Sequence, residues 1–236
     1  MGGRADPAVA LDLLARGEVA LKGRMPRSSN ATFLVEVDLE GTTALAVYKP
    51  ERGERPLWDF PPGLYRREIA AYLLSEALGW GIVPPTAPRD GPLGEGSLQL
   101  FVHADFRQHY FTLLEQAEHR EALQRICLFD LVVNNADRKS GHCLWVPDDR
   151  IYAIDHGLTF HVESKLRTVI WDFGEEPIAP ALLEDVRRVL DALPRALVDL
   201  LDPEEVRGVK RRARGLLRAG HFPVDHSGLR YPWPLI

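Results

Sequence analysis

The residues best suited to chemistry lie in one polar stretch, 134–142, which stands between two apolar runs of the chain. Asp137 belongs to this stretch, and Asp155 comes shortly afterwards, directly behind the apolar residues 151–154. The pattern predicts the end of a helix, a polar loop, two short strands joined by a turn, and then the second carboxylate. Two carboxylates at the ends of neighbouring elements could assist phosphoryl transfer, with Asp137 accepting a proton and Asp155 holding a metal ion.

Two cations, Arg138 and Lys139, follow Asp137 directly. In a phosphoryl-transfer site they would neutralise the charge that develops on the transferred group. A zinc site is the rival interpretation, and it would use His142, Cys143, His156 and His161. Their spacing matches no common zinc motif, and neighbouring residues of a strand point to opposite faces, which favours phosphoryl transfer.

Lys49 lies near the end of a predicted strand, on the same face as Leu45 and Val47. An ammonium group on an apolar face needs an anionic partner. Glu68 can supply it, because it lies on the mostly apolar stripe of a helix predicted over 64–78. In kinases such an ion pair positions the nucleotide phosphates. A salt bridge between helix and sheet without any ligand is the alternative.

The elements around these residues divide the chain into two halves. Before residue 103, strands are expected at 19–21, 33–39, 43–50, 82–83 and 97–102, with helices at 7–15 and 64–78. Beyond it, helices are expected at 106–118, 120–133, 180–193 and 203–219. The sequence therefore predicts an α+β fold, with a five-stranded sheet in the first half and helices in the second.

The segment 23–32 joins the first two predicted strands and is rich in polar and turn residues. Its backbone N–H groups and the hydroxyls of Ser28 and Ser29 could fold over nucleotide phosphates. The glycine-rich signature of a protein-kinase loop is absent, and an ordinary solvated hairpin loop is the other interpretation.

The helix at 203–219 has a basic face, which would suit an anionic membrane. A cap at Asp202, a proline in the first turn and an apolar stripe favour instead a helix that packs against the core. The segment 222–236 follows, and we expect it to lie extended against the fold. Its aromatic residues, Tyr231 and Trp233 among them, would also suit contact with a partner protein.

Length and composition limit the alternatives. The 236 residues, 45% hydrophobic and 27% charged, suffice for one large domain or two closely packed lobes. A net charge of -5 disfavours nucleic-acid binding. With 2 cysteines, no signal-peptide pattern and no apolar run long enough for a transmembrane segment, the sequence favours a cytoplasmic protein.

Six motifs follow one another in a characteristic order and spacing, namely Val47–Pro50, Tyr65–Leu74, Val83–Thr86, Leu98–Phe101, Asn135–Arg138 and Ile154–Gly157. Together they resemble the phosphatidylinositol-kinase-like group of atypical kinases. The likeness covers roughly residues 17–178 and is nearest to a family of uncharacterised bacterial proteins that carries this domain.

This resemblance implies a bilobal protein-kinase-like fold in a single domain. Its β-rich N-lobe would span about residues 17–102, a hinge about 100–104, and its α-rich C-lobe about 105–236. The resemblance also implies an ATP-dependent phosphotransferase that uses Mg²⁺ or Mn²⁺. The phosphate acceptor would be a hydroxyl on a lipid, a protein or a small molecule.

The same likeness implies roles for residues of the first half. Lys49 would contact the nucleotide phosphates, and Glu68 would orient Lys49. The adenine would be held by the backbone of Gln99, Leu100, Phe101 and Val102.

In the second half, Asp137 would be the catalytic aspartate and Asp155 the metal ligand. The family has an asparagine as a further metal ligand at the position where this chain has His142. As a ligand, an imidazole would favour manganese over magnesium. The alternative is that His142 is hydrogen-bonded to Asp137 or Asp155 without touching the metal.

The chain allows two further interpretations. The triplet Asp172-Phe173-Gly174 spells the metal motif of protein kinases, but it lies far along the chain from Asp137, whereas Asp155 ends the strand behind the catalytic loop. The site residues would also suit a pseudokinase, which binds a nucleotide without turnover and acts as a regulatory or interaction module. A proton acceptor at Asp137 favours the enzyme, because a binding module needs none.

Overall fold

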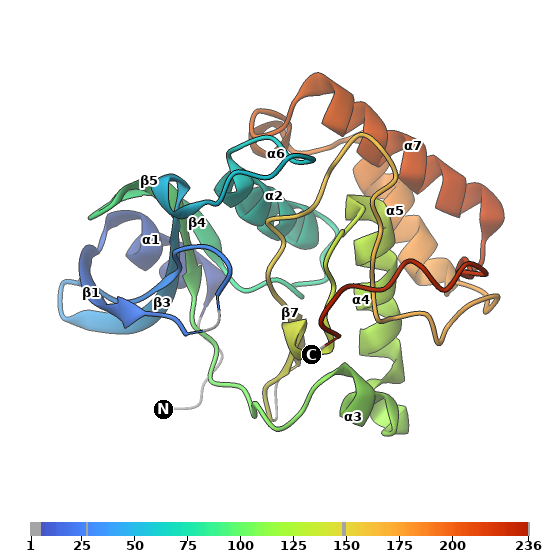
Figure 1. The fold of residues 1–236 in the computed structure, drawn as a ribbon, viewed down its shortest axis with the longest axis horizontal. Helices are drawn as coiled ribbons and strands as arrows, with labels where there is room; N and C mark the ends of the chain where they lie inside the picture. The colour runs from blue at the N-terminus through green and yellow to red at the C-terminus, as the bar shows by residue number, and fades with distance from the viewer. Residues whose placement is uncertain (1–5, 27, 148–149, 236) are drawn as a thin grey trace.

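A five-stranded antiparallel sheet forms one side of the structure, a computed structural model that describes residues 6–26, 28–147 and 150–235 (Figure 1). The strand order is β1-β2-β3-β5-β4, so β1 and β4 are its edges. The strands are β1 (Glu18–Arg24), β2 (Phe33–Leu39), β3 (Thr42–Pro50), β4 (Thr86–Gly91) and β5 (Gly94–Leu100).

One face of the sheet is closed by α1 (Pro7–Arg16), the predicted leading helix. Leu13 and Leu14 of this helix pack with buried residues of the strands, among them Val35 on β2 and Tyr48 on β3. Alternation along β3 turns Lys49 to the opposite face. The prediction that Lys49 lies on the apolar face is therefore wrong, because the buried core of the sheet is on the side of Tyr48 and Lys49 is half-buried on the other.

The opposite side of the sheet meets α2 (Leu64–Ala77), which packs against β4 and β5. The helix begins after Gly63, whose φ of 87° is open to glycine without strain. Most of its residues are buried, since it lies between the sheet and the helices of the second half (Figure 1). Its bounds agree with the predicted helix 64–78, and this position lets it carry a side chain toward either half.

The regular elements of the described second half are helices and one short hairpin, joined by long loops. Its helices are α3 (Tyr110–Leu114), α4 (Arg120–Val133), α5 (Pro180–Asp191), α6 (Arg195–Val198) and α7 (Pro203–Ala219). The hairpin is β6 (Cys143–Trp145) and β7 (Ile151–Ala153). Short 3-10 turns are η2 (Ala117–His119) and η3 (Ser140–His142) in this half and η1 (Glu51–Gly53) in the first half. The α+β, bilobal fold predicted from the sequence is thereby confirmed.

The helix α7 packs against α4 and α5, as its apolar stripe predicted. Asp202 and Glu205 form a capping box at its start, where Pro203 takes the first turn. Among the described residues, no helix combines the length and the apolar character needed to cross a bilayer.

Two predicted elements need correction. The strand expected at 82–83 is absent, because the N–H groups of Ile82 and Val83 donate to the Ser75 hydroxyl at the end of α2 (2.9 and 3.2 Å). The fifth strand is β4 instead, which pairs with β5 from Thr86 onward. Its proline and glycine suggest a loop, but an edge strand tolerates a proline such as Pro88. The helix expected at 106–118 shortens to α3.

Candidate active site

Lys49 lies between carboxylates that come from two other elements. Its Nζ donates to Oε1 of Glu68, on α2, and to Oδ1 of Asp155, in the loop behind β7, at 2.9 Å. The predicted pair of Lys49 and Glu68 is therefore present, and Asp155 joins it. One ammonium group thus connects the sheet, α2 and the polar loops of the second half.

Glu68 completes this connection through its second oxygen. Oε2 accepts the backbone N–H of His156 at 3.0 Å, and the side chain is 2% exposed. Burial raises the pKa of Glu68, and the positive charge of Lys49 opposes that shift. The carboxylate has a cation on one oxygen and an N–H donor on the other, which is what a buried anion requires.

Asp155 is the exposed member of the group, with half of its side chain accessible. The charge of Lys49 holds its pKa well below the usual range, so it is a carboxylate at neutral pH. Burial alone would lower the pKa of Lys49, but the charges of Asp155 and Glu68 raise it above its ordinary value. Asp155 has a φ of 62°, a left-handed conformation that few non-glycine residues adopt.

Asp137 lies in the loop that follows α4. Its N–H donates to the side-chain oxygen of Asn135 (3.0 Å), whose amide group in turn donates to Asp130 on α4 (2.9 Å). Its carboxylate is 3.1 Å from the ammonium group of Lys139. Burial raises the pKa of Asp137 although Lys139 opposes the shift, and the negative charge of Asp155 adds to the increase. A carboxylate tuned in this direction is better able to accept a proton.

For Arg138, expected to neutralise charge on the transferred group, the structure shows a different use. The side chain is 0% exposed, and it donates to both carboxylate oxygens of Asp130 at 2.7 and 2.9 Å. It also donates to the main-chain oxygens of His142 and Ile154 (3.3 and 2.8 Å) and lies 2.9 Å from Nε2 of His156. These contacts occupy all its N–H groups, so none remains for a phosphate.

Arg138 therefore holds the site together without reaching its exposed surface. It joins α4 to the loop of Asp137 and to the segment that carries Asp155. Asp130 was not predicted as the partner of Arg138. Its signal was a lone acid in the otherwise apolar end of α4, which a buried cation has to match.

The exposed cation beside Asp137 is Arg167. Its backbone N–H donates to Asn135 (2.9 Å), and its backbone oxygen accepts from Arg138 (3.0 Å), so it is held against the loop of Asp137. Its positive charge lowers the pKa of Asp137, which places it within electrostatic reach. Lys165, by contrast, is half-buried and lies 3.4 Å from Asp59.

His142 lies beside Asp155. The backbone N–H of Lys139 donates to Nδ1 at 3.4 Å, which leaves the ring proton on Nε2, and Nε2 is 3.5 Å from Oδ2 of Asp155. Burial lowers the pKa of His142 to about 4, so the ring is neutral at neutral pH. This arrangement favours the alternative in which His142 contacts the carboxylate rather than a metal.

The donor chemistry fits a divalent cation that takes most of its ligands from elsewhere. The described residues hold no group of three or more side chains of the metal-binding types, so the zinc interpretation finds no cluster. Asp155 offers a carboxylate that is half exposed. Magnesium and manganese are commonly held by one or two carboxylates together with nucleotide phosphates and water. Asp155 could serve in this way.

The residues expected at the adenine differ in what their polar groups do. Gln99 is buried, and its side chain donates to Thr86 at 2.9 Å. The N–H groups of Leu100 and Phe101 donate to main-chain oxygens of neighbouring strands and loops (2.8 and 2.9 Å). No hydrogen bond among the described residues uses the N–H of Val102. That group is the donor left for a ligand.

Ser28 and Ser29 stand apart from the charged group. The hydroxyl of Ser28 donates to Thr32 at 2.8 Å, within its own loop, and Ser29 is exposed. Within the part of the chain that the structure describes, no hydrogen bond or ion pair joins either serine to Lys49 or Asp155. Asp172 is also elsewhere, since its carboxylate accepts from Tyr110 at 2.6 Å.

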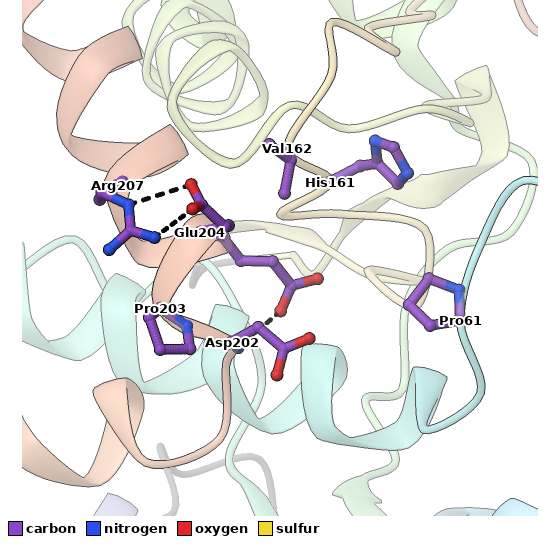
Figure 2. Close-up of a pocket in the computed structure, with 8 residues that line it drawn as sticks. Pro61, His161, Val162, Asp202, Pro203, Glu204 and Arg207 are labelled. Carbon is purple, nitrogen blue, oxygen red and sulfur yellow. Dashed lines mark hydrogen bonds and ion pairs between the residues drawn. The ribbon is translucent and has the colours of Figure 1, made fainter.

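A cavity of about 360 Å³ lies at the start of α7, away from this site (Figure 2). Figure 2 shows Glu204 and Arg207 of α7 paired at its wall, with His161 and Pro61 on the other side. None of the site residues Lys49, Asp137 and Asp155 lines it. The candidate site is therefore defined by its charged groups and not by this cavity.

Comparison with known proteins supports this description of the fold. No protein-family model matches the chain. Protein Rv2133c of Mycobacterium tuberculosis is 39% identical to it over 260 residues, which covers 94% of each protein.

Two solved structures are similar at much lower identity. The Golgi casein kinase with Mn/ADP bound is 14% identical, with a TM-score of 0.61 over 98% of this chain and 80% of that one. Hydra Fam20 with sugar is 13% identical, with a TM-score of 0.57 over 93% and 89% of the two chains. At these identities the likeness concerns the fold, which is kinase-like. Neither protein is named as a phosphatidylinositol kinase, so the finer part of the resemblance is not supported.

Proposed function

The chain belongs to the family of Protein Rv2133c of Mycobacterium tuberculosis, and we propose that it is an ATP-dependent phosphotransferase acting on an alcohol group. The observation that carries the proposal is the line of charges formed by Glu68, Lys49 and Asp155. It joins the sheet to the loops of the helical half, where Asp137 lies close enough for its pKa to respond to the charge of Asp155.

In this proposal the reaction uses two groups of the chain directly. Asp137 accepts the proton of the acceptor hydroxyl as the hydroxyl oxygen bonds to the γ-phosphorus of ATP. The bond from that phosphorus to the bridging oxygen breaks, and ADP leaves with the electron pair. Lys49 contacts the phosphates, held in direction by Glu68. The raised pKa of Asp137 suits a group that must take up a proton.

We propose Asp155 as the ligand of a divalent metal ion, with His142 steadying its second oxygen. A bound metal ion of this kind neutralises phosphate charge. The name of one structural relative includes Mn/ADP, which agrees with a nucleotide and a divalent cation but concerns that protein. Arg138 takes no part in contact with the phosphates and acts through the loops that it fixes.

The nucleotide base would lie against the connection between the halves. The N–H of Val102 is free to donate to adenine, since no described residue accepts it. This assignment treats the chain as one kinase-like domain, with an N-lobe at about residues 17–102, a hinge at about 100–104 and a C-lobe at about 105–236.

The acceptor class is open to a lipid, a protein or a small alcohol. The motifs resemble those of phosphatidylinositol-kinase-like proteins, whereas two of the solved structures with a similar fold are a casein kinase and Fam20. Arg167, exposed next to Asp137, would meet an acceptor that carries negative charge. It is the residue that we expect to contact the acceptor.

The proposal is tested by incubating the protein with labelled ATP, Mg²⁺ or Mn²⁺, and separate panels of lipids, proteins and small alcohols. We expect metal-dependent label on one class of acceptor with the natural protein and none with Asp137→Asn. A protein that binds ATP but never hydrolyses or transfers it would be the pseudokinase of the alternative. Absence of any nucleotide binding in the presence of metal would overturn the proposal.

A further inference from the structure

The segment behind α7, residues 221–235, returns to the polar loop that carries Asp137. In Figure 1 it runs from the end of α7, in dark red, back toward β7. We name it the return segment. The backbone N–H of Ser140 donates to the backbone oxygen of Leu235 at 2.8 Å, and Ser140 opens η3 immediately after Lys139.

A second pair of contacts fixes the return segment to the neighbouring strip of backbone. The oxygen of Arg230 accepts the N–H of Thr168 (3.0 Å) and the indole N–H of Trp171 (3.2 Å). Thr168 itself forms an isolated parallel bridge with Arg138. The return segment therefore contacts both the loop of Asp137 and the strip paired with that loop, and it bridges the two.

The side chains of the return segment divide into anchors and exposed groups. Phe222 is buried in the larger hydrophobic core, and Leu235 packs against that core while partly buried. Between them, Leu229 and Trp233 are 83% and 88% exposed. The segment is thus held at its two ends, with backbone hydrogen bonds at Phe222 as well as at Arg230 and Leu235.

We propose that the return segment positions the catalytic loop, and that Ser140 and Leu235 are positioning residues for the transfer reaction. The expected change in turnover rests on the proposed function, whereas the expected change in hydrogen exchange of the loop does not. Two residues of the loop, Asn135 and Arg138, are fixed through Asp130 of α4. The Ser140 N–H is the point at which the return segment holds the loop, so releasing it should loosen Asp137 while the contacts of Lys49 with Glu68 and Asp155 stay in place.

The sequence offers a clean way to remove this one hydrogen bond. Proline lacks the N–H and is accepted at the first position of a helical turn, which is where Ser140 stands. Lys139, with φ of -89° and ψ of 161°, already has the backbone conformation that a following proline requires. Ser140→Ala is the matched comparison, because it keeps the N–H and removes a buried hydroxyl that has no partner among the described residues.

The experiment compares Ser140→Pro and Leu235→Asp with Ser140→Ala, and with Leu229→Ala as an exposed control in the same segment. Hydrogen exchange is measured on peptides covering residues 134–144, together with the Kd for ADP with Mn²⁺ and the rate of ATP hydrolysis with water as acceptor. We expect Ser140→Pro and Leu235→Asp to speed exchange, to lower kcat by roughly fivefold or more, and to leave the Kd for ADP unchanged.

Each outcome decides something different. Unchanged exchange at 134–144 in both variants would overturn the inference, whatever the activity. Faster exchange with unchanged kcat would show that the loop is held but that its position does not matter to the reaction, and would also overturn it. If the natural protein fails to turn over ATP, the proposed function is at fault, while the exchange data still test the contact. Should Ser140→Pro not fold, Leu235→Asp still tests the contact, because it keeps the backbone oxygen but removes the apolar side chain that packs that end of the return segment on the core.

Discussion

Lys49 and Asp155 are joined by a 2.9 Å contact between Nζ and Oδ1, across 106 positions of the sequence. The contact places the ammonium of β3 on the carboxylate that we assign to the metal. A metal ion bound with its nucleotide would therefore compete with Lys49 for Asp155, and the ammonium group of Lys49 would then contact the phosphates. Without ligand, each group neutralises the other, which allows both to remain charged between the sheet and the loops of the second half.

Lys49 and Glu68 should act on nucleotide binding as a unit. Glu68 is 2% exposed, so Lys49→Met leaves a buried carboxylate that has lost its cation. Glu68→Gln removes the carboxylate that orients the Lys49 ammonium group. We expect each single change to weaken the affinity for ATP and the double change to add little, with an interaction energy of about 0.5–3 kcal/mol. Calorimetric titration of the four proteins measures this cycle. Losses that simply add would contradict the pair.

Asp137 and Asp155 should separate turnover from binding. Asp137→Asn is expected to lower kcat by roughly a hundredfold to ten-thousandfold, because it removes the proton acceptor, and to leave the Kd for ATP nearly unchanged. Asp155→Asn should instead weaken binding of ATP in the presence of metal and have little effect on ATP alone. Single-turnover assays with parallel binding measurements distinguish the two. If both variants lose affinity equally, the division of roles is wrong.

Asp130 and Arg138 form a buried ion pair whose loss should destabilise the fold. Arg138 is 0% exposed and Asp130 is 1% exposed, so Asp130→Asn leaves a buried guanidinium without its counter-charge. We expect the free energy of unfolding to fall by about 3–5 kcal/mol. Urea titration measures this change. The control is Arg195→Gln, which removes the exposed ion pair of Arg195 with Asp199 and should lower the free energy of unfolding by less than about 1 kcal/mol. Equal losses would mean that the buried pair carries no special weight.

Stability should fall as the pH drops through the range in which histidine ordinarily titrates. Burial lowers the pKa of His142 to about 4 and that of His156 well below its usual value. The unfolded chain takes up these protons near pH 6.5, whereas the folded chain resists them, so stability is complete above about pH 6.5 and declines below it.

The measurement for this prediction is the urea midpoint of the natural protein and of His156→Gln at several pH values. Glutamine keeps an acceptor for Arg138, which contacts Nε2 of His156. The decline between about pH 7.5 and pH 5 should be shallower in the variant, because one buried neutral histidine is gone. Parallel curves would show that other groups produce the decline.

His142 should support Asp155 without selecting the metal. Its Nδ1 accepts from the backbone of Lys139 and its Nε2 faces Asp155, so no bare ring nitrogen points at the metal position. We expect His142→Asn to lower kcat/KM with both metals and to leave the ratio of the Mn²⁺ and Mg²⁺ rates unchanged. A shift of that ratio toward magnesium would instead identify His142 as a ligand.

The elements with strong local signals could be predicted from the sequence. The helix α7 combines a cap at Asp202, a proline and an apolar stripe, and β2 alternates cleanly, so both are found at their predicted places. The pair of Lys49 and Glu68 was also predicted, because the two charges lie on neighbouring elements, although Lys49 lies on the face opposite to the predicted one.

Other features depended on contacts that no local pattern reveals. The strand β4 looks like a loop and is a strand only because β5 is there to pair with it. Arginine is a residue type that often binds phosphate, but Arg138 is buried here. The chain turns at Asn134 in a left-handed conformation, and Arg138 then pairs with Asp130. The contact of Leu235 with Ser140 joins distant parts of the chain through backbone atoms alone, so residue types could not indicate it.

Asp155 holds a φ of 62°, where a glycine would be unstrained and where other residues cost at most about 1–2 kcal/mol. A descendant freed from its chemistry could exchange this carboxylate for glycine and relieve the strain, with Glu68 left as the partner of Lys49. Under selection for the fold alone, we expect the aspartate at position 155 to be replaced. The side chain found there in any related protein is then a record of whether its lineage kept the reaction or only the shape.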